Sequence, residues 1–89
     1  MGFEYDPAKS AKNQAKHGVD FERAQALWDD PDLLSVRTTF PGEERWISIG
    51  VMQGKHWTAV WTPRGGNTRI ISVRRSRDKE VQLYESHDR

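Results

Sequence analysis

The chain has 89 residues, enough for one domain (residues 1–89) with a single modest core. Its formal net charge is only +1, so a surface that binds nucleic acid must come from local clustering of charge. The absence of cysteine excludes disulfides, thiolate metal sites and a cysteine nucleophile, and three widely spaced histidines predict no metal site. No apolar run approaches the roughly 18 residues of a membrane span, and the first residues lack signal-peptide character. We therefore expect a cytoplasmic protein that has no contact with a membrane and needs no cofactor.

Two helices are predicted near the N-terminus. The first begins at Asp6-Pro7, because aspartate caps helices and proline suits the first helical position, and it ends at Gly18. Asp20 is expected to cap the second helix, which ends before Pro31. The apolar stripe of this helix consists of Phe21, Ala24, Leu27 and Trp28.

From residue 33 onward the apolar period changes to two, which predicts strands. The four predicted strands are 33–40, 44–51, 55–62 and 68–75. Their connections are too short for parallel crossovers, so we expect an antiparallel meander. A two-residue turn at Gln53-Gly54 would place Ile47 opposite Val60 and Trp46 opposite Trp61, and a turn at Pro41-Gly42 would place Val36 opposite Ile47.

This register predicts which side chains share a face of the sheet. One face would collect Leu34, Val36, Ile47, Ile49, Val51, Val60 and Ile70. The other would hold Arg37, Trp46, Ser48, Trp57, Ala59, Trp61, Arg69, Ile71, Val73 and Arg75. We expect the two N-terminal helices to cover the aliphatic face.

The last strand is predicted to stop at Arg74-Arg75, and Ser76 to cap a C-terminal helix that carries Tyr84. Six of the 14 Lys and Arg residues lie between Arg64 and Lys79, which indicates an anionic partner. The predicted fold is therefore α+β, with two N-terminal helices, a four-stranded antiparallel meander and a C-terminal helix.

Three blocks of the sequence carry recognisable motifs. They are FEYDPAKSAKNQAKHGVDFERA, GEERWISIG and RIISVRRSRDKEVQLYE. The motifs within them are Tyr5-Asp6, Asn13, Lys16-His17-Gly18, Glu44-Arg45, Ile49-Gly50, Ile71-Ser72-Val73-Arg74, Glu80 and Tyr84. In this order they resemble the BrnT toxins of bacterial type II toxin–antitoxin systems. The chain departs from the family at Tyr5, where Trp is common, and at Val73, where Ala is common; both changes affect packing more than chemistry.

The resemblance implies a RelE-like ribonuclease fold and an RNA-cleaving toxin that inhibits translation. It also implies a BrnA-type antitoxin with a ribbon-helix-helix, in a complex expected to hold two copies of each chain. Operator DNA would be bound only through the antitoxin. The alternative is a non-catalytic module that binds RNA or a partner and acts as a co-repressor with its antitoxin.

RNA cleavage without a metal requires a proton acceptor, a proton donor and groups that stabilise the charge on the phosphorus. Arg45 and Arg74 are the candidates for the phosphate because the arginine fork binds oxygens in pairs. The alternative is an arginine–carboxylate bridge, for example between Arg45 and Glu80. His17 is the candidate proton carrier, since imidazole titrates near neutral pH, but capping of its helix explains it equally well.

Four more residues are predicted to bind RNA: Lys16, Arg64, Arg75 and Tyr84. For Arg64, in a glycine-rich loop, simple solvation is the alternative. For Tyr84 the alternative is packing at the edge of the core. The tryptophans of the second face could stack on bases, although contact with a partner or with the core also accounts for them.

Overall fold

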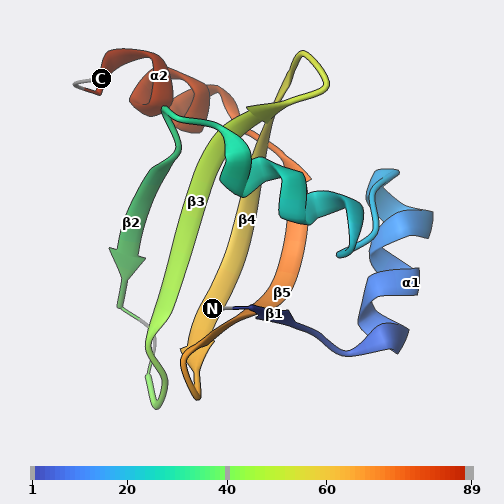
Figure 1. Cartoon of the computed structure of the whole chain (residues 1–89). Helices are drawn as coiled ribbons and strands as arrows, with labels where there is room; N and C mark the ends of the chain where they lie inside the picture. Colours follow the sequence, from blue (N-terminus) through green and yellow to red (C-terminus); the bar gives the residue numbers. More distant parts are fainter. Residues whose placement is uncertain (1, 40, 88–89) are drawn as a thin grey trace.

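The computed structural model describes residues 2–39 and 41–87 (Figure 1). Along these residues the elements are β1 (Phe3–Glu4), α1 (Pro7–His17), the 3-10 helix η1 (Arg23–Asp29), β2 (Leu34–Thr38), β3 (Arg45–Met52), β4 (Lys55–Arg64), β5 (Asn67–Arg75) and α2 (Asp78–Ser86). Across the described ranges, no helix has both the length and the apolar character needed to span a membrane. Phe40, at the predicted end of the first strand, lies outside the described residues.

The sheet has five strands in the order β1-β5-β4-β3-β2. The prediction of a four-stranded antiparallel meander was therefore wrong, because β1 adds a fifth strand that pairs in parallel with β5. Phe3 lies opposite Thr68 and Glu4 opposite Arg69. A strand of two residues shows no period, and its partner lies 65 residues further along the chain. Local patterns therefore could not reveal it.

The predicted pair of N-terminal helices also needs correction. The first helix is as predicted: Asp6 Oδ1 accepts a hydrogen bond from Ala8 N at 2.9 Å, and Gly18 takes the left-handed φ of 81°. The second is a short 3-10 helix that starts at Arg23. Asp20 still provides a hydrogen-bond acceptor for a free backbone N–H group at the start of this helix, because Asp20 Oδ1 accepts from Arg23 N at 2.8 Å. With seven residues, η1 is longer than the usual 3-10 run of three or four.

The strand register agrees with the turn chemistry. Val36 pairs with Ile47, Ile47 with Val60, and Trp46 with Trp61, as predicted. Gln53 and Gly54 have φ values of 55° and 74°, the two positive values that a two-residue hairpin turn of this kind requires. The turns therefore determined the alignment of β2, β3 and β4 correctly.

A β-bulge at Ile71 changes the faces of β5. Val60 pairs with Ser72 and Trp61 with Ile70, so Ile71 has no partner in the ladder. Beyond the bulge the alternation reverses: Ile70 is only 2% exposed on the core face, and Arg69 shares the opposite face with Thr62. The predicted faces of Ile70 and Arg69 were wrong for this reason.

The main core lies on the face opposite to the one we expected. Val19, Phe21, Ala24 and Leu27, together with Met52, Trp57, Ala59, Ile70 and Val73, form one buried cluster. The 3-10 helix η1 thus covers the predicted polar and aromatic face. Gly50 allows this close approach, since a Cβ there would lie 2.8 Å from Leu33 Cδ1 and 3.1 Å from Leu27 Cδ1.

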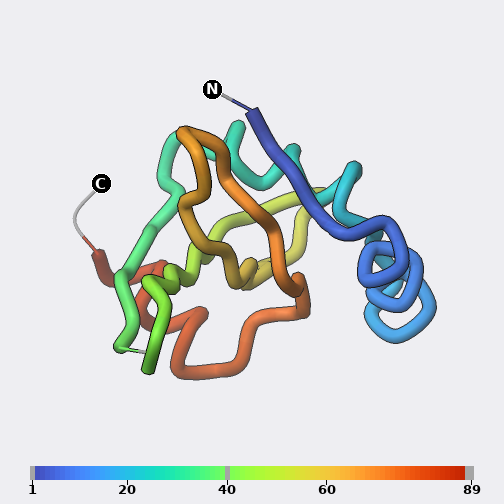
Figure 2. Tube along the Cα trace, turned by 90° about the horizontal axis from the view of Figure 1, so that it is seen from below, coloured from blue at the N-terminus to red at the C-terminus, as the bar shows by residue number. Residues whose placement is uncertain are grey.

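The aliphatic face is covered only at one end. Ile49 is fully buried, together with Tyr84 of α2, whereas Val36 is 38% exposed and Ile47 and Val60 are half-buried. We call the surface formed by Val36, Ile47, Val60 and Ser72 the open face. In Figure 1, η1 crosses the sheet and α2 lies at the end near the start of β2. Figures 1 and 2 both place α1 beyond β5, at the edge of the sheet.

The start of α2 also differs from the prediction. Arg77 is its N-cap, and the predicted cap Ser76 instead forms a 2.8 Å hydrogen bond from its Oγ to Thr58 Oγ1. Glu80 replaces the missing cap, because Glu80 Oε1 accepts from Arg77 N at 2.8 Å. A glutamate three residues into a helix is well placed to reach back to the N-cap.

Candidate functional site

Arg74 forms a bidentate ion pair with Glu80. Arg74 Nη1 and Nη2 donate to Glu80 Oε1 and Oε2 at 2.7 and 2.8 Å. The two side chains are only 20% and 13% exposed, and Thr58 Oγ1 donates to the same carboxylate at 3.1 Å. Hydrogen bonding from Arg74, opposed in part by burial, lowers the pKa of Glu80 to about 2. An arginine–carboxylate bridge to Glu80 is thus present, with Arg74 in the place suggested for Arg45.

Arg45 lies at the other end of the same face. Its side chain is 28% exposed, and its Nε donates to Glu43 Oε2 at 2.6 Å. Arg45 lies beside Thr62, whereas Arg74 pairs with Thr58, four residues away along β4. That distance is roughly 13 Å along the strand. The structure therefore does not bring the two arginines together at one point of the sheet.

His17 and Lys16 line a groove between α1 and β5. This groove, the α1 groove, has a volume of about 300 Å³ and is lined by Lys9, Lys12, Asn13, Lys16, His17, Ile71 and Ser72. None of these described lining residues is acidic. Ser72 pairs with Val60, so its side chain belongs to the open face. The structure thus brings His17 and Lys16 together in one groove at the β5 edge of the sheet.

Arg45 and Arg64 line a second groove next to the first. This hairpin groove has a volume of about 400 Å³ and is lined by Lys9, Glu43, Glu44, Arg45, Thr62, Pro63, Arg64, Arg69 and Ile71. Arg69 Nη1 is 3.0 Å from Glu4 Oε2, and this contact lowers the pKa of Glu4. The two grooves share Lys9 and Ile71, so they join at the β-bulge. Bulges often re-aim side chains beside active sites.

Arg75 and Tyr84 lie away from both grooves. The Arg75 guanidinium carbon is 5.7 Å from the centre of the Trp57 ring, on the core face of the sheet. Tyr84 is 3% exposed, and its hydroxyl donates to Asp30 Oδ2 at 2.6 Å. The structure therefore favours the packing interpretation of Tyr84. The tryptophans are also packed, with Trp46 and Trp61 stacked at 5.7 Å between ring centres.

Asn13 has a structural role that its sequence context did not predict. Its Nδ2 donates to Val73 O at 2.9 Å and to Val19 O at 2.8 Å, and its Oδ1 accepts from Val73 N at 3.2 Å. The side chain takes the place of a neighbouring strand at the β5 edge and fixes α1 there. Lys9 and Lys12 were also missed, although their spacing with Lys16 places all three on one side of α1.

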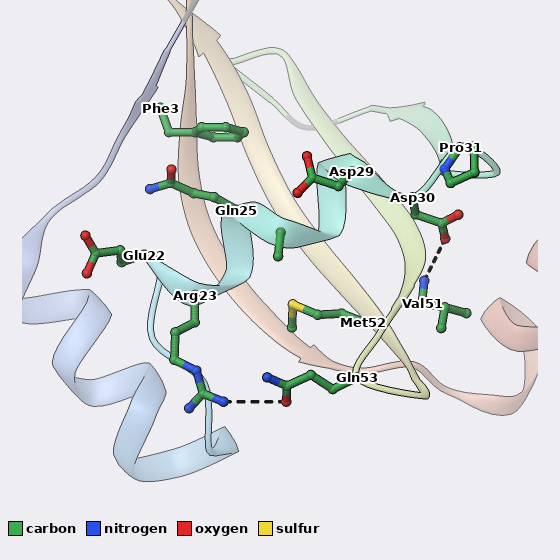
Figure 3. Close-up of a pocket in the computed structure, with 11 residues that line it drawn as sticks. Phe3, Glu22, Arg23, Gln25, Asp29, Asp30, Pro31, Val51, Met52 and Gln53 are labelled. Atoms are coloured by element: carbon green, nitrogen blue, oxygen red, sulfur yellow. Dashed lines mark hydrogen bonds between the residues drawn. The ribbon is translucent and has the colours of Figure 1, made fainter.

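A depression larger than either groove lies elsewhere, along η1 (Figure 3). It has a volume of about 970 Å³, and its described lining includes three carboxylates, Glu22, Asp29 and Asp30, against one cation, Arg23. Arg23 Nη2 reaches Gln53 Oε1 at 3.5 Å, and Asp30 Oδ2 accepts from Val51 N at 2.8 Å. This excess of negative charge repels phosphate. The two basic grooves at β5 are therefore the candidate site.

Comparison with protein families assigns the chain to one of them. The model of the BrnT family, described as the ribonuclease toxin of a type II toxin–antitoxin system, matches residues 5–80. No curated protein sequence matches the chain. The matched segment contains α1, the whole of β2 to β5 and the start of α2, and with them both basic grooves. The chain belongs to the BrnT family of ribonuclease toxins, which act on RNA and are paired with an antitoxin.

Proposed function

We propose that the chain is a metal-independent endoribonuclease whose chemistry takes place where the α1 and hairpin grooves meet. In the proposed reaction the ribose 2′-hydroxyl loses its proton and attacks the adjacent phosphorus, and the bond to the 5′-oxygen breaks. The products are a 2′,3′-cyclic phosphate and a 5′-hydroxyl. The observation that carries the proposal is that His17 and Lys16 share one groove, and that Arg45 and Arg64 share the groove adjoining it.

Each side chain has a proposed task. His17 carries a proton between the attacking and leaving oxygens, because imidazole can both accept and donate near neutral pH. Arg45 stabilises the charge that develops on the phosphorane, and Lys16 and Arg64 hold neighbouring phosphates. Both terminal nitrogens of Arg74 already donate to Glu80, so we propose that Arg74 stabilises the position of α2 on the sheet. Direct contact of Arg74 with a phosphate, as predicted from the sequence, is the alternative, and the Arg74→Lys variant described below distinguishes the two.

The test is cleavage of a labelled RNA in EDTA by wild type and by His17→Gln. We expect wild type to remain active and His17→Gln to lose about 10²–10⁴-fold in rate, the usual contribution of a positioned acid or base. His87→Gln serves as the control, since His87 lies at the end of α2 with its Nδ1 near Tyr84 O. An RNA with a single 2′-deoxyribose at the cut site should resist cleavage there. Loss of wild-type activity in EDTA, or full activity of His17→Gln, contradicts the proposal.

We propose in addition that cleavage inhibits translation in the cytoplasm and that the inhibitor is a BrnA-type antitoxin with a ribbon-helix-helix. The family assignment supports this, because a type II toxin has a protein antitoxin. The expected complex contains two copies of each chain and binds operator DNA through the antitoxin alone.

A further inference from the structure

We infer that Lys9 holds a phosphate at the junction of the two grooves, and that the substrate crosses this junction as single-stranded RNA. The inference rests on the proposed function for the identity of the substrate. It adds Lys9 as a phosphate-binding residue and single-stranded RNA as the form of the substrate, neither of which the family assignment gives. Lys9 and Ile71 are the two residues that line both grooves. A polynucleotide that passes from His17 to Arg45 must therefore pass Lys9.

The charge of Lys9 is available for a ligand. Two of the arginines in the hairpin groove are held by carboxylates: Arg45 by Glu43 and Arg69 by Glu4. Lys9 is exposed, and no ion pair found among residues 2–39 and 41–87 includes it. A flexible ammonium group of this kind suits a phosphate as a point charge.

The surroundings of Lys9 also suit one strand of RNA. Lys9, Lys12 and Lys16 follow one side of α1, while Ile71 offers an apolar surface in the middle of the path. Proteins that bind single strands follow the backbone with a basic groove and contact the bases mainly through aromatic side chains. In the α1 groove the basic residues follow α1, and Ile71 offers an aliphatic contact for a base. In-line attack by a 2′-hydroxyl also requires a backbone that is free to leave the regular A-form geometry of a duplex. Both features favour a single strand over a double helix.

The experiment measures binding of an RNA that cannot be cut. The probe is a single-stranded 2′-O-methyl oligonucleotide of about 12 nucleotides, within the range of site sizes of single-strand binding proteins. Affinity is measured by fluorescence anisotropy over a series of salt concentrations for the full wild-type chain, Lys9→Gln and Lys79→Gln. Lys79 is the matched control, because it is an exposed lysine on α2, outside both grooves.

We expect Lys9→Gln to bind more weakly by a similar factor for every sequence, and to lower the slope of log K against log salt by about 0.7, the value for one phosphate on a single strand. Lys79→Gln should keep the wild-type slope, and the duplex form of the probe should bind more weakly than the single strand. A merely structural role of Lys9 would change melting temperature and not this slope.

The outcomes separate this inference from the proposed function. A wild-type chain that binds the probe with a Lys9-dependent slope but never cuts RNA keeps the inference and refutes the nuclease mechanism. A wild-type slope in Lys9→Gln, equal binding of duplex, or no binding of the probe overturns the inference. If Lys9→Gln keeps the RNA slope but loses affinity for the antitoxin, the junction is a protein interface and the inference is wrong.

Discussion

At the scale of single residues, the Glu80 carboxylate connects strand, helix and turn. It accepts hydrogen bonds from the Arg74 fork, from Thr58 Oγ1 and from Arg77 N, and so joins β5, β4 and the start of α2. A carboxylate with several donors is strongly favoured in its charged form. The same contacts hold the arginine fork in one orientation, which limits what Arg74 can give to a substrate.

The first prediction concerns Arg74→Lys. Lysine keeps the positive charge but cannot make the paired contact with Glu80, so we expect a loss of roughly 1–2 kcal/mol in the free energy of unfolding. In a domain of this size this corresponds to a fall in melting temperature of about 5–15 °C. RNA cleavage per folded molecule should stay near wild type. Arg77→Lys is the control. A normal melting temperature of Arg74→Lys together with strongly reduced cleavage would instead show that Arg74 contacts the phosphate.

The second prediction concerns pH. The pKa of Glu80 is about 2 in the folded chain, below its ordinary value of 4.5, so its contribution to stability is present above about pH 4.5 and is lost as the pH falls toward 2. A shift of this size corresponds to roughly 3 kcal/mol as an upper value. Glu80→Gln should therefore be less stable than wild type at pH 7, and the two should converge by pH 2 to 3 in urea titrations.

Asp78→Asn is the control for this comparison, because Asp78 is an exposed carboxylate in the same first turn of α2. It should leave the difference between pH 7 and pH 3 close to that of wild type. A constant gap between wild type and Glu80→Gln across the whole pH range would show that the ionised Arg74–Glu80 pair is not its origin.

At the scale of elements, the position of α1 decides whether the two grooves exist. The helix has few apolar residues, and Asn13 and Ser10 are its buried side chains. Ser10 Oγ accepts from Phe21 N at 2.9 Å, and Asn13 bonds both backbone groups of Val73. Polar contacts therefore fix the helix that carries Lys9, Lys16 and His17.

The third prediction follows for Asn13→Ala. The change leaves buried backbone groups of Val73 and Val19 without partners, and we expect a cost of about 2–4 kcal/mol. Hydrogen exchange at the amide of Val73 should become faster, because that amide donates to Asn13 Oδ1. Gln14→Ala, at an exposed neighbouring position, is the control. Slow exchange at Val73 together with an unchanged unfolding free energy would contradict the role we assign to Asn13.

The elements also show what the sequence could reveal. Helix caps and two-residue turns act between near neighbours, so Asp6, Gly18 and the Gln53-Gly54 turn were predicted correctly. The bulge at Ile71 has no such signal, because Arg69 to Val73 reads as an unbroken strand and the missing partner belongs to β4. The prediction of which sheet face the helices cover was wrong, because it relied on the number of aliphatic residues on each face. Gly50, which allows η1 to approach the other face closely, does not contribute to that number.

For the candidate site, too, the sequence indicated residue types but not their positions in the fold. Arg45, His17, Lys16 and Arg64 were identified by residue type, and the structure places them in two adjoining grooves. The separation of Arg45 from Arg74, the burial of Tyr84 and the position of Arg75 depend on register and on the packing of α2. Those facts arise from contacts between distant segments, which single-residue chemistry does not encode.

At the scale of the whole molecule, the two faces of the sheet differ in charge and in how far helices cover them. The core face carries η1 and the acidic depression, while the open face carries the basic grooves and the exposed Val36. Arginine is among the residues that commonly dominate protein interfaces. Because an inhibitor of an RNA-cleaving enzyme gains by covering the path of the substrate, the open face is where we expect the antitoxin.

The fourth prediction is a stable complex of two toxins and two antitoxins in which the antitoxin covers the hairpin groove with Arg45 and Arg64. Co-expressed chains should elute together in size-exclusion chromatography at micromolar concentration, with the mass of a 2:2 assembly by light scattering. In the complex, Arg45 and Arg64 should be protected from guanidine-directed labelling, whereas Arg23 in the acidic depression should react as in the free toxin. Separate elution of the two chains would refute this prediction.

The parallel pairing of β1 with β5 bears on how the chain becomes active during synthesis. Glu4 meets Arg69, 65 residues later, and α1 acquires its contact with Val73 only when β5 is present. Synthesis proceeds at about 5–20 residues per second, so α1 leaves the ribosome several seconds before its place on the sheet exists. A truncated chain that ends before β5 contains His17, Lys16 and Arg45 but has neither groove. If the grooves form the cleavage site as proposed, we expect the chain to cleave no RNA until its last strand has emerged from the ribosome.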